Sequence, residues 1–269
     1  MRTESDLLGE LQIPETAYYG VQTQRAINNF KISNNYLSHY PEFVKALGVV
    51  KLGAAQANHE LGILSKELFD AISFASNELI AGKYTEQFPI DMIQGGAGTS
   101  TNMNANEVIA NIALEHLGKQ KGEYQFCSPN DHVNLSQSTN DAYPSALKLA
   151  LFNMNKPLVE ALTSLYEAFD KKGKQFGNVI KMGRTQLQDA VPMTLGQEFE
   201  GFSNTLHKEV DNLNRIATEL LVINMGATAI GTGLNAVPGY AQLCTTKIAE
   251  IMNEDVSLAD NLVEATSDT

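Results

Sequence analysis

The sequence has 269 residues, of which 43% are hydrophobic, which is enough for one large domain or two modest ones. Its formal net charge of −12 argues against a nucleic-acid or membrane-surface partner, because both attract basic clusters. No run approaches the roughly 20 apolar residues of a transmembrane helix, no signal-peptide pattern is present, and the two cysteines form no metal-ligand or disulfide pattern. We therefore expect a cytoplasmic protein with reduced cysteines.

The first 40 residues show no sustained hydrophobic period and carry scattered Pro, Gly and Tyr residues, so we predict an irregular arm there. Helical periodicity follows at about 42–60, 65–82 and 103–117, with Gly, Pro and Asn residues between the runs. These runs predict a mostly helical N-terminal region.

A polar stretch, GGAGTSTNMN from residue 95, overlaps the start of the third helix. Three glycines within residues 95–98 allow backbone conformations that other residues avoid, and Thr99, Ser100 and Thr101 supply hydroxyl groups. The stretch lacks the Gly-Lys-Ser/Thr ending of a phosphate-binding P-loop. A flexible loop with a helix cap and a ligand-binding loop both fit this pattern.

A second polar stretch, SQSTNDAYP at residues 136–144, opens a long helix. A helix start needs only one capping side chain. The free amide groups and the positive dipole of a helix start make a carboxylate a reasonable ligand. A surface helix with surplus capping residues is the alternative. The stretch offers five candidate caps: Ser136, Ser138, Thr139, Asn140 and Asp141.

Two apolar stripes follow, from Leu147 to Phe169 and from Leu195 to Ala217, each spaced 4-3-4-4-3-4. They predict helices of roughly 30 residues, about 45 Å long. Two helices cannot cover both stripes, so we predict a helix bundle completed by later sequence or by other subunits. The second helix should end near Gly226, and a further helical pattern covers 257–265. The sequence then ends without a cap, so we expect a truncated chain.

Between the stripes, KMGRTQLQDAVPMTLGQEF at residues 181–199 forms a third polar stretch. Its composition is typical of a loop or of a ligand site, and we interpret Arg184 and Asp189 as a structural ion pair. The five histidines show no spacing typical of metal ligation, so we predict no metal site. Only His132 lies close to a polar stretch.

Taken together, three segments resemble, in order and in wording, the aspartase/fumarase superfamily of lyases. They are GGAGTSTNMNANEVIAN, NDHVNLSQSTNDAYP and KMGRTQLQDAVPMTLGQEF. Further similar segments are DLLGELQIPETAYYGVQTQRAINNF, FPIDMIQGGAGTS, KGEYQF and NMGATAIGTGLN. The resemblance spans the whole sequence but covers only a little over half of a family chain.

The resemblance implies a mainly α fold in three domains, of which two are represented. Residues 1–138 match an N-terminal, mostly helical domain, and residues 139–269 match the first long helices of a central helix bundle that is left incomplete. By the same resemblance, we expect the C-terminal domain to be missing from this sequence. In the family, four subunits join their bundles and each active site takes residues from three subunits, so we expect a homotetramer.

The reaction that the resemblance implies is the reversible deamination of L-aspartate to fumarate and ammonia through an enediolate, a step of amino-acid metabolism. On matching positions, Thr99, Ser138 and Thr139 resemble ligands of the reacting carboxylate. Asn140 resembles the group that holds the substrate ammonium, and Thr185 resembles a contact to the other carboxylate. Fumarate hydratase, another lyase of the superfamily, and a non-catalytic helical assembly protein remain alternatives.

Gln186 occupies a position where fumarases and some aspartases carry His. An amide does not titrate, so it cannot serve as a general acid or base. Hydroxide needs a proton in order to leave, whereas ammonia leaves an ammonium-bearing carbon without help. Gln186 therefore favours ammonia elimination over hydration.

The general base of the family is a serine in a Gly-Ser-Ser-x-x-Met-Pro loop, and no such pattern occurs in this sequence. No residue is therefore assigned as the base, and we expect the chain to be inactive alone. The resemblance implies no cofactor. A divalent cation activates some family members, but the sequence predicts no defined site for one.

Overall fold

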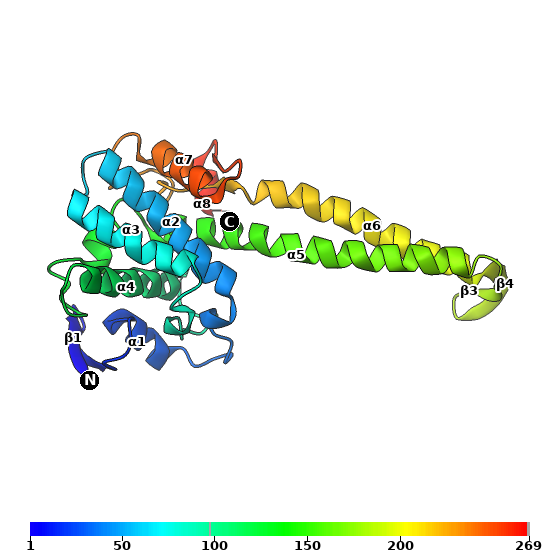
Figure 1. The fold of residues 1–269 in the computed structure, drawn as a ribbon, viewed down its shortest axis with the longest axis horizontal. Helices are drawn as coiled ribbons and strands as arrows, with labels where there is room; N and C mark the ends of the chain where they lie inside the picture. The colour runs from blue at the N-terminus through cyan, green and yellow to red at the C-terminus, as the bar shows by residue number, and fades with distance from the viewer. Residues whose placement is uncertain (97, 268–269) are drawn as a thin grey trace. The chain divides into compact units, whose positions relative to one another are not determined.

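The computed structural model describes residues 1–96 and 98–267 and confirms the prediction of a mainly helical fold (Figure 1). Contacts within the chain divide it into two compact units. The first holds residues 1–150 and those from Leu221 onward, and the second holds Leu151–Leu220. The domain boundary predicted after residue 138 concerns the family's domains and stays a prediction.

The first unit is built mainly from helices. The 3-10 and π helices are short: η1 (Leu37–His39), η2 (Thr85–Gln87) and the π helix η3 (Pro129–Val133). The strands form two small pairs: β1 (Arg2–Asp6) with β2 (Gly9–Ile13), and β5 (Val222–Ile223) with β6 (Ser257–Leu258). The α-helices are α1 (Val21–Asn29), α2 (Pro41–Glu60), α3 (Lys66–Ile80), α4 (Thr99–His116), the start of α5 (Thr139–Gln175), α7 (Tyr240–Met252) and α8 (Leu262–Ser267).

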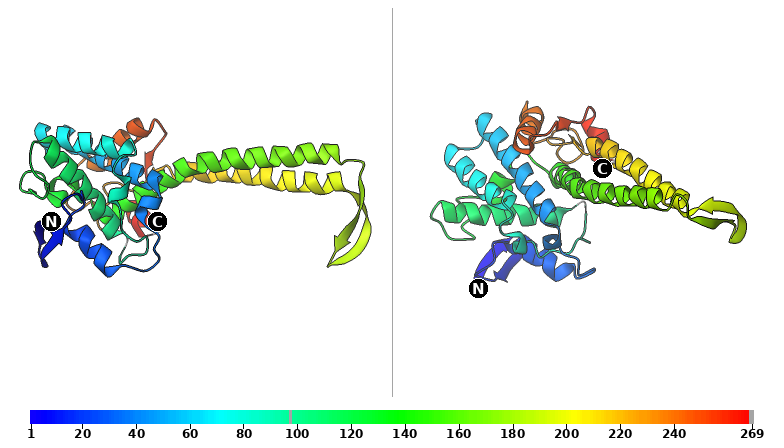
Figure 2. Two further views of the ribbon diagram at one scale, coloured as in Figure 1. Left: turned by 60° about the horizontal axis from the view of Figure 1, so that its bottom comes forward. Right: turned by 45° about the vertical axis from the view of Figure 1, so that its right-hand side comes forward.

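The core of the first unit lies around α2, which packs against both α3 and α7, while α3 also packs against α4 (Figures 1 and 2). Leu47, Val50 and Ala54 of α2 are fully buried, as are Ile109 and Leu114 of α4. Both helices were predicted from the apolar residues that recur along them, although α4 also buries polar side chains such as Asn102 and Glu107.

The predicted irregular arm at the N-terminus is wrong, because a β-hairpin and α1 occupy it. The hairpin turns at Leu7 and Leu8, with the Leu8 amide donating to Asp6 Oδ1 at 2.9 Å and Gly9 at a φ of 112°. Each element is short, so neither produces the sustained period on which the prediction depended.

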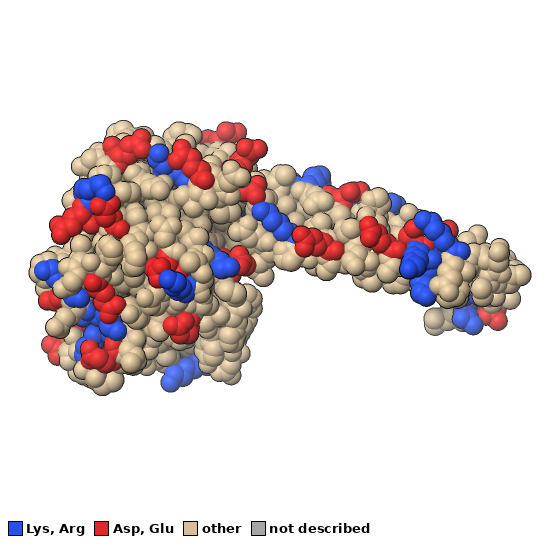
Figure 3. Space-filling view, viewed as in Figure 1, with Lys and Arg blue, Asp and Glu red and all other residues tan. Residues whose placement is uncertain are grey.

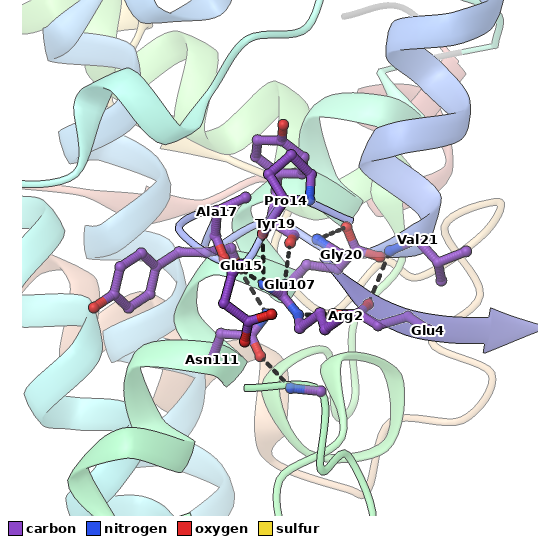
Figure 4. A network of polar contacts seen from close by, with 12 residues as sticks. Arg2, Glu4, Pro14, Glu15, Ala17, Tyr19, Gly20, Val21, Glu107 and Asn111 are labelled. Carbon is purple, nitrogen blue, oxygen red and sulfur yellow. Dashed lines mark hydrogen bonds and ion pairs between the residues drawn. The ribbon is translucent and has the colours of Figure 1, made fainter. Parts of the chain in front are cut away.

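Two carboxylates from elsewhere in the chain hold the N-terminus of α1 (Figure 4). The amides of Gly20, Gln22 and Thr23 donate to Glu107 of α4, and the Val21 amide donates to Glu4 of β1. Burial raises the pKa of Glu107 to about 7, against the lowering effect of these donors. The helix lacks a side-chain cap of its own, so α4 and β1 supply its missing acceptors.

The second unit contains the rest of α5, the strands β3 (Ile180–Thr185) and β4 (Gln188–Thr194), and α6 (Leu195–Glu219). The hairpin replaces the loop considered for this segment, and Arg184 pairs with Asp189 at 3.1 Å as predicted. Helix α6 begins with a capping box, in which Thr194 and Gln197 bond each other's backbone amides.

The C-terminal part of the first unit differs from the prediction in detail. Helix α6 ends at Glu219 rather than near Gly226, because the chain then enters β5 and a turn in which Gly226 has a φ of 83°. The helical pattern expected over 257–265 is divided, since β6 pairs in parallel with β5 before α8 begins.

Apolar residues remain exposed along both long helices of the second unit. Leu158 and Leu165 of α5 are 49% and 45% exposed, and Phe202 of α6 is 50% exposed although it contacts Phe169. This agrees with the prediction that two helices cannot cover both stripes. In the described part of the chain, no helix is long and apolar enough to cross a membrane. On the face drawn in Figure 3, acidic and basic side chains are interspersed.

Candidate functional site

The N-terminal ends of α4 and α5 meet in the first unit. Gly98, the residue before α4, has a φ of 90°, and the ring of Tyr143 in the first turns of α5 fills the space that a Cβ would need. Only glycine fits both the backbone conformation and the close approach. The first residue of α4, Thr99, is thereby brought next to the beginning of α5.

Thr99 also lines a small surface pocket of about 230 Å³. Ser100 and Met103 of α4 form one side of this pocket, and Gln22 and Arg25 of α1 contribute to the other. The Arg25 guanidinium is engaged by Asp6, with Nε–Oδ2 and Nη2–Oδ1 distances of 2.9 and 2.7 Å. Besides this ion pair, the polar side chains that line the pocket are the hydroxyls of Thr99 and Ser100 and the amides of Gln22 and Asn29.

Two of the five candidate caps close the start of α5. The Ser138 hydroxyl oxygen accepts from the Asn140 amide at 3.3 Å, and Asp141 Oδ1 accepts from the Ser138 amide at 2.9 Å. Asp141 is buried and its Oδ2 accepts from the Thr228 amide at 2.8 Å. Burial raises the pKa of Asp141 to about 6, against the effect of these donors. Ser138 and Asp141 therefore cap the helix, which leaves Thr139 and Asn140 for other roles.

The side chain of Thr139 is an acceptor within the protein. Its Oγ1 accepts from Asn102 Nδ2 of α4 at 3.3 Å, which joins the two helix starts. Neither the Thr139 nor the Ser138 hydroxyl donates to a protein acceptor among the hydrogen bonds of the described residues. Each hydroxyl therefore keeps its proton for an outside acceptor.

Asn140 is oriented by the turn that follows β5. Its Nδ2 donates to the Ala229 carbonyl at 2.7 Å, and its backbone carbonyl accepts from Asn224 Nδ2 at 3.1 Å. Because the amide nitrogen faces Ala229, the Oδ1 atom is the end that remains for a ligand. An amide oxygen accepts hydrogen bonds, so this end suits a cationic donor.

A buried lysine beneath these helix starts was missed by the sequence analysis. Lys51 of α2 is fully buried and donates to Asn102, Asn134 and Gln137. Burial lowers the pKa of Lys51 to about 7, against the favourable charge of Asp141. The available signal was a single cation within the apolar stretch LGVVKLGAA.

Thr185 and Gln186 lie in the second unit, in the β3–β4 hairpin. Thr185 pairs with Gln188, and the two-residue turn between them has positive φ values of 48° at Gln186 and 67° at Leu187. All of these side chains are exposed. The structure therefore groups Thr99, Ser138, Thr139 and Asn140 within one unit, while Thr185 and Gln186 belong to the other.

His132, which precedes the second polar stretch in the sequence, lies within the π helix η3. His132 Nδ1 accepts a hydrogen bond from the Ser128 amide at 2.9 Å, which gives the ring a local structural role. Across residues 1–96 and 98–267, no group of three or more His, Cys, Asp or Glu residues could hold a metal ion.

Comparison with known proteins gives a consistent family. A family model described as "Lyase" matches residues 9–269. Aspartate ammonia-lyase of Pseudomonas aeruginosa is 58% identical over 268 residues, which is 99% of this chain and 56% of that protein. The chain thus spans a little over half the length of the curated relatives that it matches.

Solved structures agree with this family. A fumarate lyase:delta crystallin structure from Brucella melitensis, bound to cobalt, has a TM-score of 0.93 at 50% identity, covering 98% of this chain and 58% of that one. A class II fumarase from Schistosoma mansoni has a TM-score of 0.88 at 34% identity and the same coverage.

Proposed function

The chain belongs to the lyase family, and on this basis we propose that its protein catalyses the reversible deamination of L-aspartate to fumarate and ammonia. The observation that carries this proposal is the pair of adjacent hydroxyls, Ser138 and Thr139. Each uses its oxygen to accept a bond from the protein and keeps its proton for a ligand. These donors lie at the N-terminus of a 37-residue helix, where the dipole also favours an anion.

The reaction needs such donors because its intermediate is highly charged. A base removes a proton from the carbon beside the side-chain carboxylate of L-aspartate, and that carboxylate becomes an enediolate with roughly twice the negative charge. Thr99, Ser138 and Thr139 are proposed to donate to its oxygens. One preoriented donor of this kind is worth about 2.7–4 kcal/mol of transition-state stabilisation.

The remaining roles concern the rest of the substrate. Asn140 Oδ1 is proposed to accept from the ammonium group, because its amide nitrogen is committed to Ala229. Thr185 is proposed to contact the second carboxylate. Gln186 lies beside it and cannot donate or remove a proton as an acid or base, which suits the departure of ammonia rather than hydroxide.

The proposal includes a homotetramer whose active sites are each shared between three subunits. Support comes from Leu158, Leu165 and Phe202, which remain about half exposed in the second unit. A domain boundary after residue 138 and a cytoplasmic location, suggested by two free and buried cysteines, also belong to the proposal. We assign no general base within residues 1–269, and the proposed chemistry uses no cofactor.

A fumarase function is the second candidate, because a class II fumarase shares the fold at a TM-score of 0.88. The two reactions are distinguished by following fumarate absorbance in the longest protein that contains these residues, first with L-aspartate and then with L-malate. We expect turnover of L-aspartate. Turnover of L-malate alone contradicts the proposal, and inactivity on both substrates favours the non-catalytic assembly protein.

A further inference from the structure

The ammonium group of Lys51 is surrounded by three side-chain amide oxygens. Its Nζ lies 2.8 Å from Asn102 Oδ1, 2.8 Å from Gln137 Oε1 and 3.0 Å from Asn134 Oδ1. An ammonium group has three protons and no acceptor, so these three oxygens match its donors one for one. The described residues show no carboxylate in ion-pair contact with Lys51, which means that the lysine acts here as a donor to amides.

This arrangement fixes the orientation of the Asn102 side chain. A protonated lysine can only donate, so the Asn102 oxygen must face the Lys51 ammonium. The Asn102 nitrogen then points the other way, where it lies 3.1 Å from Asn134 Oδ1 and 3.3 Å from Thr139 Oγ1. If the amide were reversed, its nitrogen would meet the donors of Lys51 and its oxygen would meet Asn134 Oδ1.

The orientation of Asn102 in turn decides what Thr139 can do. Because its hydroxyl oxygen accepts from Asn102, its proton is left for another acceptor. We propose that Lys51, acting through Asn102, is a positioning residue that keeps the Thr139 hydroxyl as a hydrogen-bond donor to the reacting carboxylate of the substrate. This inference rests on the proposed function of Thr139 and adds two residues to it, neither of which contacts the substrate.

The sharpest test is Asn102→Asp in the longest protein that contains these residues. An aspartate of nearly the same volume keeps the bond to Lys51 and strengthens it with charge. Its second oxygen takes the place of the Asn102 nitrogen, which removes the bond to Asn134 Oδ1. The Thr139 hydroxyl can then turn to donate to the new carboxylate instead of to the substrate. We expect kcat for L-aspartate to fall about 10²-fold, as for the loss of one preoriented donor, with a smaller change in KM.

A double-mutant cycle with Thr139→Val separates positioning from general damage. Where Thr139 has no hydroxyl, Asn102→Asp should lower kcat less than about threefold, because coupled residues are not additive. Lys51→Met removes the donor that fixes the Asn102 amide. We expect it to lower kcat strongly when Thr139 is present and only slightly in the Thr139→Val background. Equal losses in the presence and absence of the Thr139 hydroxyl would overturn the inference.

Asn134→Asp is the matched control. It places the same new carboxylate beside Lys51 and loses the bond from Asn134 Nδ2 to the Gln137 carbonyl. An oxygen still accepts from Asn102 Nδ2, so Asn102 keeps its orientation toward Thr139. We expect the loss in kcat to be less than about threefold, as for a change outside the coupled pair. A loss as large as that of Asn102→Asp would assign the effect to charge in the cluster and would overturn the inference.

The cycle also distinguishes this inference from the proposed function. If L-malate rather than L-aspartate is turned over, the proposed function fails and the same cycle is measured with L-malate. If neither is turned over, calorimetry with succinate as a dicarboxylate probe replaces kinetics. Asn102→Asp should then weaken succinate binding only when Thr139 carries its hydroxyl, and a protein that does not bind succinate contradicts the inference.

Discussion

Lys51 in the first unit and Leu165 in the second both occupy the environment that their side chains normally avoid. The lysine is fully buried and the leucine is 45% exposed. Lys51 finds three amide oxygens within its own unit, so its burial is compensated locally. Leu165 has no comparable cover in its own unit. The polar cluster around Lys51 is thus completed within one unit, whereas the apolar stripes of the long helices stay partly uncovered in theirs.

Among these predictions, removal of the Thr139 hydroxyl, the proposed hydrogen-bond donor at the start of α5, should have the largest effect on turnover. Thr139→Val removes the hydroxyl proposed to bind the enediolate, so we expect kcat to fall by about 10²–10³-fold, as for other preoriented donors. The free energy of unfolding should change by only about 1 kcal/mol, because a single neutral hydrogen bond is lost. Steady-state kinetics and urea denaturation of the same variant check both values. Near-normal kcat removes Thr139 from the site.

The exposed apolar residues of the long helices are tested by measuring whether subunits still associate when one of these residues is replaced. Leu165→Asp places a charge where the proposed interface buries an apolar side chain worth about 1.5–3 kcal/mol per subunit. We expect dissociation to smaller species by light scattering. Ile63→Asp is the matched control, because Ile63 is 39% exposed in the first unit and lies outside the long helices. Equal association of both variants would contradict the assembly.

A smaller effect, on the stability of the fold, is expected when the pH is lowered. Asp91 accepts from the Ser33 hydroxyl and from the amides of Ile32, Ser33, Asn34 and Ile93. The Ser33 bond, followed by these amides, holds the pKa of Asp91 well below its ordinary value of 3.8. The folded state therefore binds this proton more weakly than the unfolded state.

The stability that Asp91 contributes is thus present above pH 3.8 and is lost as the pH falls below that value. Asp91→Asn should lower the unfolding free energy at neutral pH and flatten its decline below this value. Urea denaturation at a series of pH values measures both. An unchanged acid limb in the variant would assign the decline to other carboxylates.

The smallest effect on stability is expected from breaking the ion pair in the β3–β4 hairpin of the second unit. Arg184 and Asp189 are 65% and 68% exposed, so water screens their ion pair. Arg184→Ala should change the unfolding free energy by less than about 1 kcal/mol. A larger loss, measured by urea denaturation against Asp189→Ala, would show that the pair supports the hairpin more than its exposure suggests.

The hydrophobic period of the sequence predicted the long helices in which apolar residues recur every three or four positions, such as α2 and α4. It missed the β3–β4 hairpin because the turn residues, Gln186 and Leu187, are not the Asn and Gly that such turns favour. The motifs singled out Thr99 and Thr139, which lie at the starts of α4 and α5, but they gave no indication of Lys51. Its partners lie 51 to 86 residues away in the sequence and meet only in the folded chain.

The hydrogen bonds that Glu4 and Glu107 accept from the start of α1 also affect the pocket that contains Thr99. A nine-residue helix is too short to persist on its own, so α1 exists only while acceptors from a distant strand and helix are in place. Because α1 also supplies one wall of the pocket that contains Thr99, damage to the extreme N-terminus is transmitted to that pocket. A change to residues 2–6, which form β1, is therefore expected to alter the pocket that Thr99 lines.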